Sequence, residues 1–260
     1  MPHVSALYRY PVKGFTPERR PHLVVQEDGR VRGDRALVFR FADATEPEDA
    51  TFPKSRGLAL MTFPTLARIA LTYDDDSGSL RLRVDDIDLE ADLSEEGRTR
   101  LAEAVTAYLR SSSDAHLLDA EGVLPLGLIG DGRTARFQDR PQGYISLHGE
   151  ASVAELDATV SAPVDDRRFR SNIVVSGAPA WAELGWEGLV RIGEVLFDVQ
   201  KPIERCAAIT ANPDTGVRDA RLLRVLTSTF DQDVPTLGIL LLPVDGGGVI
   251  REGDEVTIDA

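Results

Sequence analysis

The chain contains a single cysteine, Cys206, in the segment KPIERCAAITANPDTG at positions 201–216. Arg205 directly precedes it, and Lys201 lies close by in the same segment. Cationic neighbours favour the thiolate form of a cysteine, which is the form that acts as a nucleophile and as a ligand of soft metals. The sequence therefore predicts a functional thiol. The alternative is an inert core residue, because free cysteine is among the most buried residue types.

Other residues suited to binding an anion stand where predicted strands begin or end. Lys13 follows the strand pattern of LYRYPVKG, and Arg35 begins the strand pattern of GDRALVF. Arg170 and Asn172 belong to FRSNIVVSG, where the asparagine offers an amide donor. Each cation alone is compatible with an exposed surface charge. Together, arginines and amide donors at strand ends suit the binding of a phosphate group.

Composition limits the classes of function. The formal net charge of −14 opposes nonspecific binding to nucleic acid and requires a local basic pocket for any anionic ligand. One cysteine excludes an intrachain disulfide and an iron–sulfur cluster held by this chain alone. The N-terminus lacks the apolar core of a signal peptide, and no apolar run is long enough for a membrane span. We expect a cytoplasmic protein with no membrane or nucleic-acid partner.

The element pattern predicts a mixed, predominantly β (α+β) fold. In the first third of the chain, short runs that alternate apolar and polar residues predict strands. A helix that begins after Ser94 follows, and its apolar residues share one face: Leu101, Ala104, Val105, Tyr108 and Leu109. Ser152 and Glu155 are spaced as a capping box and predict the start of a second helix. The C-terminal region predicts two strands joined by a glycine-rich hairpin. The sequence between the two predicted helices, about 111–142, is rich in loop-forming residues and predicts a boundary between two domains, 1–120 and 121–260.

Several of these motifs, in this order, resemble the MOSC domain proteins, and in particular the subgroup of the mitochondrial amidoxime-reducing component and its bacterial relatives. They are LYRYPVKG, GDRALVF, FRSNIVVSG, AWAELGW, RIGEVLFDVQKPIERC, NPDTG and IREGDEVTI. The resemblance implies a β-barrel-like MOSC domain at 121–260, preceded by a smaller MOSC N-terminal β-barrel-like domain at 1–120.

The resemblance also implies a cofactor and a site. The cofactor would be the molybdenum cofactor (molybdopterin), with Cys206 as metal ligand and catalytic residue. Lys13 and Arg35 match residues that hold the phosphate end of the cofactor, and Arg170, Asn172 and Arg205 match further cofactor contacts. Three positions depart from the family pattern, namely Gly14, Gly149 and Glu204.

Two functions follow from the resemblance, and a third reading is open. The first is a molybdenum-dependent oxidoreductase that reduces small N-hydroxylated or related N–O and S–O compounds. A chain with one cysteine cannot carry its own iron–sulfur domain, so a separate ferredoxin- or flavin-type protein would supply the electrons. The second is a noncatalytic carrier of the molybdenum cofactor or a sulfur-transfer protein. The third is a degenerate member that binds no metal.

Overall fold

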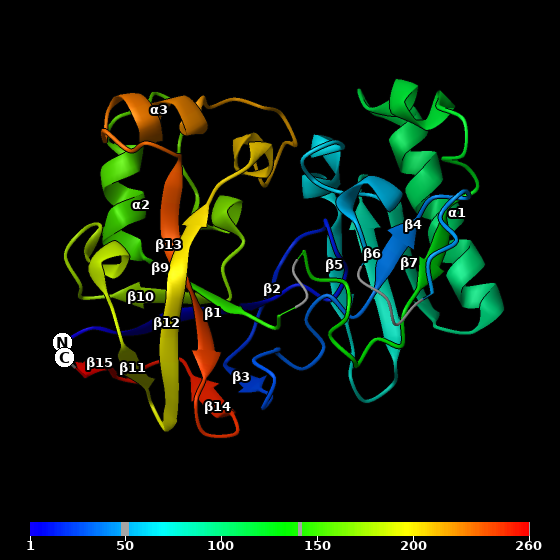
Figure 1. The fold of residues 1–260 in the computed structure, drawn as a ribbon. Coiled ribbons are helices and arrows are strands. Elements are labelled where there is room, and N and C mark those ends of the chain that lie inside the picture. Colours follow the sequence, from blue (N-terminus) through cyan, green and yellow to red (C-terminus); the bar gives the residue numbers. More distant parts are fainter. Residues whose placement is uncertain (48–51, 140–141, 260) are drawn as a thin grey trace.

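Two lobes lie side by side in the computed structural model, which describes residues 1–47, 52–139 and 142–259 (Figure 1). One lobe contains an eight-stranded sheet with two short helices, and the other contains smaller sheets and the longest helix, α1 (Glu95–Ser111). The two chain ends lie together in the first lobe, where the Val256 amide donates to the Pro2 carbonyl oxygen at 2.9 Å. The fold is mostly β, so the predicted fold class is confirmed.

The large sheet joins strands from both ends of the sequence, in the order β15-β11-β12-β13-β9-β10-β1-β2. β1 pairs antiparallel with β10, which in turn pairs parallel with β9. The sheet curls into a half-barrel whose interior is filled by apolar side chains, among them Leu7, Leu147 and Phe197. Its strands are β1 (His3–Arg9), β2 (Glu18–Arg19), β9 (Ile145–Gly149), β10 (Ile173–Ser176), β11 (Leu189–Ile192), β12 (Val195–Glu204), β13 (Thr236–Pro243) and β15 (Val256–Asp259).

The helices of this lobe pack on a second cluster of apolar side chains. α2 (Glu150–Asp157) buries Val153 and Leu156, and α3 (Leu222–Ser228) buries Leu222 and Leu226. Single turns of 3₁₀ helix connect many of the elements of both lobes. They are η1 (Lys54–Arg56), η2 (Pro64–Arg68), η3 (Ala115–Asp119), η4 (Asp166–Phe169), η5 (Ala182–Gly185) and η6 (Ala207–Thr210).

In the other lobe, a three-stranded antiparallel sheet packs against α1. Its strands β5 (Ala70–Tyr73), β6 (Ser79–Val84) and β7 (Ile87–Asp92) alternate apolar and polar residues, so that one face is buried. Ser94 caps α1 by accepting a hydrogen bond from the Gly97 amide, as the sequence predicts. A further pair, β4 (Val38–Arg40) with β8 (Gly127–Ile129), completes this lobe.

Two local predictions are wrong. α2 begins after Gly149, so Ser152 lies inside the helix, and its hydroxyl donates to the buried Glu183 carboxylate at 2.8 Å instead of capping. The glycine-rich segment does lead into a strand, β14 (Gly248–Arg251), but β14 pairs with β3 (His22–Val25) and not with β13. Both errors have the same cause. A local pattern predicts hydrogen bonds between residues close in sequence, whereas here the partners come from distant parts of the chain.

The domain boundary at 120/121 stays a prediction. β1 and β2, which precede it, lie in the same sheet as strands that follow it. Among the described residues, no helix is long and apolar enough to cross a membrane.

Candidate functional site

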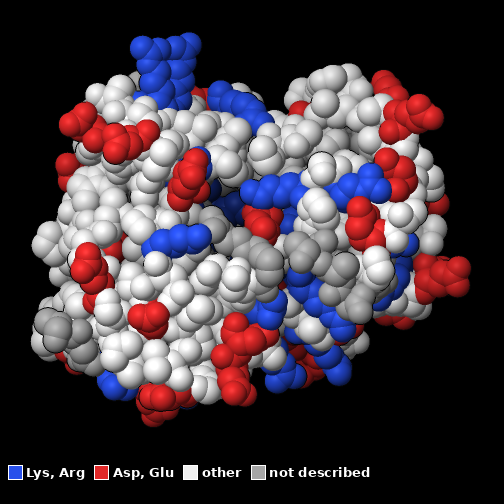
Figure 2. All heavy atoms as spheres, viewed as in Figure 1, with Lys and Arg blue, Asp and Glu red and all other residues white. Residues whose placement is uncertain are grey.

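A cavity of about 420 Å³ lies where the two lobes meet. Figure 2 shows Lys and Arg side chains bordering a hollow between the lobes, with acidic side chains among them. Ala59, Leu60 and Met61 line the cavity from one lobe, and residues 203–206 line it from the other. All six predicted site residues also line it: Lys13, Arg35, Arg170, Asn172, Arg205 and Cys206.

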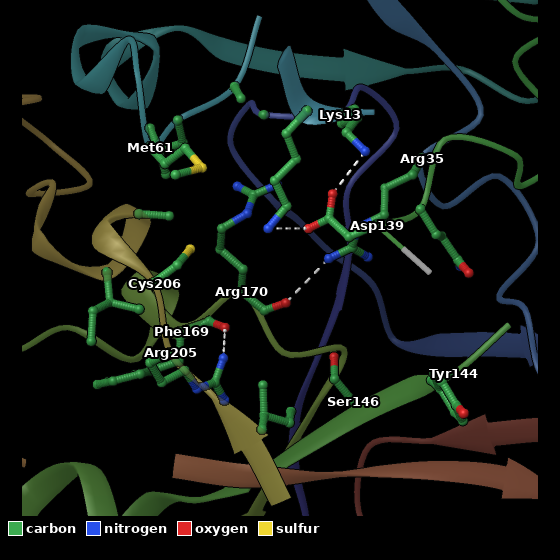
Figure 3. A pocket seen from close by; sticks show the side chains of 18 of the residues that line it. Lys13, Arg35, Met61, Asp139, Tyr144, Ser146, Phe169, Arg170, Arg205 and Cys206 are labelled. Carbon is green, nitrogen blue, oxygen red and sulfur yellow. Dashed lines mark hydrogen bonds and ion pairs between the residues drawn. The ribbon is translucent and has the colours of Figure 1, made fainter. Parts of the chain in front are cut away.

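Cys206 follows the long strand β12 and stands at the start of η6. Its side chain is free and only partly buried, and in Figure 3 the sulfur points into the cavity on the side of Met61. This position does not fit the alternative of a sealed core residue. Lys201, the second cation near the thiol in the sequence, is exposed on β12 and is not among the residues that line the cavity.

Arg205 lines the cavity and is anchored by backbone carbonyl groups and an aromatic ring. Its guanidinium donates to the carbonyl oxygens of Leu237 at 2.7 Å and Phe169 at 2.6 Å, and it lies 5.5 Å from the centre of the Phe169 ring. The side chain is buried, and burial lowers the pKa of Arg205 to about 10. Among the described residues, no carboxylate lies within ion-pair distance of it. Arg205 is therefore a buried cation whose charge the described protein leaves uncompensated.

Arg35 and Arg170 converge on one aromatic ring. Their guanidinium carbons lie 4.7 and 4.4 Å from the centre of the buried Tyr10 ring, close enough for cation–π attraction. Arg35 forms an ion pair with the buried Asp34 and donates to the Arg170 carbonyl oxygen at 3.3 Å. Arg170 donates to the Phe15 carbonyl oxygen.

The two arginines differ in how their charge is balanced. Burial alone would lower the pKa of Arg35, but the charge of Asp34 raises it above its ordinary value. Burial lowers the pKa of Arg170, and the positive charge of Arg35 adds to this effect. In the part of the chain that the structure describes, Arg170 has no ion-pair partner. Arg170 is thus a second uncompensated cation on the cavity wall, and it is partly buried.

Lys13 is tied to an acidic residue that the sequence analysis missed. Its ammonium donates to the Asp139 carboxylate and to the Phe137 carbonyl oxygen, at 2.8 and 2.9 Å. Lys54 binds the other oxygen of Asp139 at 2.9 Å. Burial would raise the pKa of Asp139, but the charges of Lys13 and Lys54 lower it to about 2, whereas burial lowers the pKa of Lys13. No local motif marks Asp139, which lies in a loop-like segment far from Lys13 in sequence.

Asn172 lines the cavity, but its side-chain amide is engaged within the protein. Its nitrogen donates to the Tyr8 carbonyl oxygen at 3.2 Å and to Asp34 at 3.3 Å, and its oxygen accepts from the Ser146 hydroxyl at 2.9 Å. Asn172 therefore holds Asp34, which in turn holds Arg35. Direct donation from Asn172 to a ligand stays a prediction, and one of these bonds would first have to break.

The three positions that depart from the family pattern have different structural settings. Gly14 has a φ of +85°, and a Cβ atom there would lie 2.8 Å from the Leu58 carbonyl oxygen, so a side chain is disfavoured. At Gly149, a Cβ atom would approach the buried Glu183 carboxylate at 3.0 Å, and the residue does not line the cavity. Glu204 does line the cavity, but it is exposed and forms no ion pair with Arg205.

Comparisons with family models and known proteins were consistent with this architecture. The model of the MOSC N-terminal beta barrel domain matches residues 1–116, and that of the MOSC domain matches residues 134–257. Mitochondrial amidoxime reducing component 2 of Rattus norvegicus is 34% identical over 122 residues, which are 43% of this chain and 36% of that protein. Molybdenum cofactor sulfurase of Oryza sativa subsp. japonica is 33% identical over 129 residues, which are 45% of this chain and 15% of that protein.

The chain thus matches well under half the length of these curated relatives. Among solved structures, the YUAD protein from Bacillus subtilis is 12% identical, with a TM-score of 0.41, over 98% of this chain and 94% of that one.

Proposed function

Because the chain belongs to the proteins that combine a MOSC N-terminal beta barrel domain with a MOSC domain, we propose that its cavity binds a molybdenum cofactor, with Cys206 as the ligand of the metal. The observation that carries the proposal is the charge balance of the cavity wall. The chain has 43 acidic and 29 basic residues, yet the buried Arg205 and the partly buried Arg170 have no ion-pair partner in the described residues. A buried charge without a counterion costs several kcal/mol, so an anionic ligand is the expected partner.

The donor set fits a pterin dithiolene with a terminal phosphate. Lys13 and Arg35 would hold the phosphate end, since an ammonium and a planar guanidinium are the usual partners of that group. Arg170 and Arg205 would neutralise the remaining negative charge. Cys206 offers a soft sulfur ligand on the side of the cavity opposite Lys13 and Arg35 (Figure 3).

In this proposal the protein orients and the cofactor supplies the redox chemistry. When bound, the molybdenum centre would provide two-electron removal of an oxygen atom from small N-hydroxylated or related N–O and S–O compounds, as the name of the rat relative suggests. Leu60, Met61 and Ile203 give part of the cavity wall an apolar character and would help to exclude water from a bound substrate. A separate ferredoxin- or flavin-type protein in the same compartment, which we place in the cytoplasm, would supply electrons.

The name of the rice relative supports a second candidate, a carrier of the cofactor or a sulfur-transfer protein. In that case Cys206 would hold the cofactor or a persulfide without turning over an N-oxide. A reduction assay with a chemical electron donor distinguishes the two, because only the oxidoreductase consumes an N-hydroxylated substrate in proportion to its molybdenum content.

Metal and pterin analysis tests the binding itself, with protein purified from a host that makes the cofactor. C206S should retain its fold and lose molybdenum, because a hydroxyl is a harder ligand of nearly the same volume. R170A should fold and lose pterin, since one charge-assisted contact to an anion is worth about 2 kcal/mol, or about thirtyfold in affinity. The control is R100A, an exposed residue of α1 that should keep the wild-type content. Equal molybdenum in C206S and wild type would remove Cys206 from the metal site.

A further inference from the structure

All three N–H bonds of the Lys13 ammonium are already used inside the protein. An ammonium group has three donors and no acceptor. In this structure one donates to Asp139 at 2.8 Å, one to the Phe137 carbonyl oxygen at 2.9 Å, and one to the Phe52 carbonyl oxygen at 3.4 Å. An anion that enters the cavity can therefore bind Lys13 only if one of these partners leaves.

The three partners differ in their freedom to move. The two carbonyl groups belong to Phe52 and Phe137, whose rings are buried and packed edge to face with their centres 5.7 Å apart. The Asp139 side chain is 48% exposed and lies at the border of the cavity. Its other oxygen binds Lys54, which is 41% exposed, so the carboxylate keeps a counterion when it swings outward. Asp139 is the replaceable partner.

We propose that the Asp139 carboxylate occupies the place of a phosphate monoester group in the cavity, and that the ligand phosphate exchanges with it on Lys13. The inference deepens the proposed function, on which it rests for the identity of the ligand. Asp139 then sets specificity. A monoanion that replaces the carboxylate gains nothing in charge, whereas a phosphate brings nearly two negative charges and three acceptor oxygens. The exchange selects phosphate esters over the many monoanions of a cell.

Calorimetric titration with inorganic phosphate and with acetate tests the exchange, on wild-type protein and on D139N. Wild-type protein should bind phosphate but not acetate. D139N should bind phosphate about tenfold more tightly or better. A carboxylate that leaves Lys13 free for only about one-tenth of the time would reduce the apparent affinity for phosphate about tenfold. It should also bind acetate measurably. The control is D119N, which removes an exposed carboxylate of η3 that pairs with Arg110 of α1; neither residue lines the cavity, so D119N should match wild type.

Every outcome bears on the proposal. Weaker or unchanged phosphate binding in D139N would overturn it, and would make Asp139 a residue that positions Lys13. If D139N folds only when phosphate is present, and D119N shows no such dependence, phosphate has taken the place of the carboxylate, as proposed. If D139N stays unfolded at saturating phosphate, phosphate cannot replace the carboxylate and the proposal fails. The molybdenum content of wild-type protein judges the proposed function separately, because inorganic phosphate exchange needs no metal.

Discussion

His148 is a buried titratable residue just behind the cavity wall. Its ring packs against that of Phe169, with centres 5.7 Å apart, and neither ring nitrogen has a hydrogen-bond partner in the described structure. Burial, with a smaller contribution from the charge of Arg205, lowers the pKa of His148 to about 3. The imidazole is therefore neutral in the folded protein over the whole range in which a free histidine becomes charged.

A pH-dependent loss of stability follows. The unfolded chain binds a proton at His148 below about pH 6.5, and the folded chain does not until about pH 3. The stabilisation is present above pH 6.5 and is lost as the pH falls through that window, by at most about 1.4 kcal/mol per pH unit. H148L removes the titrating group, so its free energy of unfolding should fall less steeply between pH 6.5 and 4. Denaturant unfolding at several pH values measures this, and parallel curves for the two proteins would contradict it.

At the residue scale, the sequence predicts the members of the cavity better than their partners. Lys13, Arg35, Arg170, Arg205 and Cys206 stand beside strand ends, where local patterns mark them. Their partners are distant in sequence: Asp139 binds Lys13 across 126 positions, and only the folded chain brings Tyr10 under two arginines. Because no local rule encodes such contacts, the sequence does not show that Lys13 and Arg35 have carboxylate partners while Arg170 and Arg205 have none in the described residues.

At the scale of elements, one buried ion-pair network joins the end of β1 to the three-stranded sheet of the other lobe. Arg9 donates to Glu18 at 2.8 Å, to Asp75 at 2.8 Å and to the Tyr73 carbonyl oxygen at 3.0 Å. Glu18 also accepts from the Tyr73 amide. Lys13 follows β1 by only a few residues, so the network fixes the position from which it enters the cavity.

Loss of Glu18 should be costly. E18A leaves the Tyr73 amide without an acceptor and leaves the Arg9 guanidinium with only the partly exposed Asp75 as counterion. We expect a loss of about 3 kcal/mol, the lower end of the range for breaking a buried pair. The control is D88A, which breaks the exposed pair between Arg81 and Asp88 on the hairpin of β6 and β7 and should cost less than about 1 kcal/mol. Denaturant unfolding compares the two variants. Similar losses in both would show that the buried network adds no more stability than a surface pair.

The type of an element was predictable where its apolar residues follow one clear periodicity, but the pairing of strands was not. The helix opened by Ser94 and the hairpin of β6 and β7 have clear periodic patterns. The partner of β14 is β3, which lies more than two hundred positions away, and the buried Glu183 takes the hydroxyl that a capping box would use. Hydrogen-bond partners at such separation leave no mark on the local pattern.

For the whole molecule, the sheet and the cavity both depend on residues from each end of the chain. β10 has β9 on one side and β1 on the other, and β14 has β3 as its partner. The cavity takes Lys13 and Arg35 from before position 120 and Arg170, Arg205 and Cys206 from after it. Fragments cut at the predicted domain boundary would therefore each carry only part of the large sheet and part of the site.

The fragment 121–260 should not fold alone. Without β1 and β3 it exposes the edge of β10, the edge of β14 and the apolar face that Leu7 and Leu23 cover in the intact protein, and such edges favour aggregation. We expect it to be insoluble or to elute in aggregates on gel filtration, and to become soluble when coexpressed with 1–120, because the second fragment restores both pairings. A monomeric 121–260 with cooperative thermal unfolding would show that its strands form a self-sufficient core, and that β1 only adds to it.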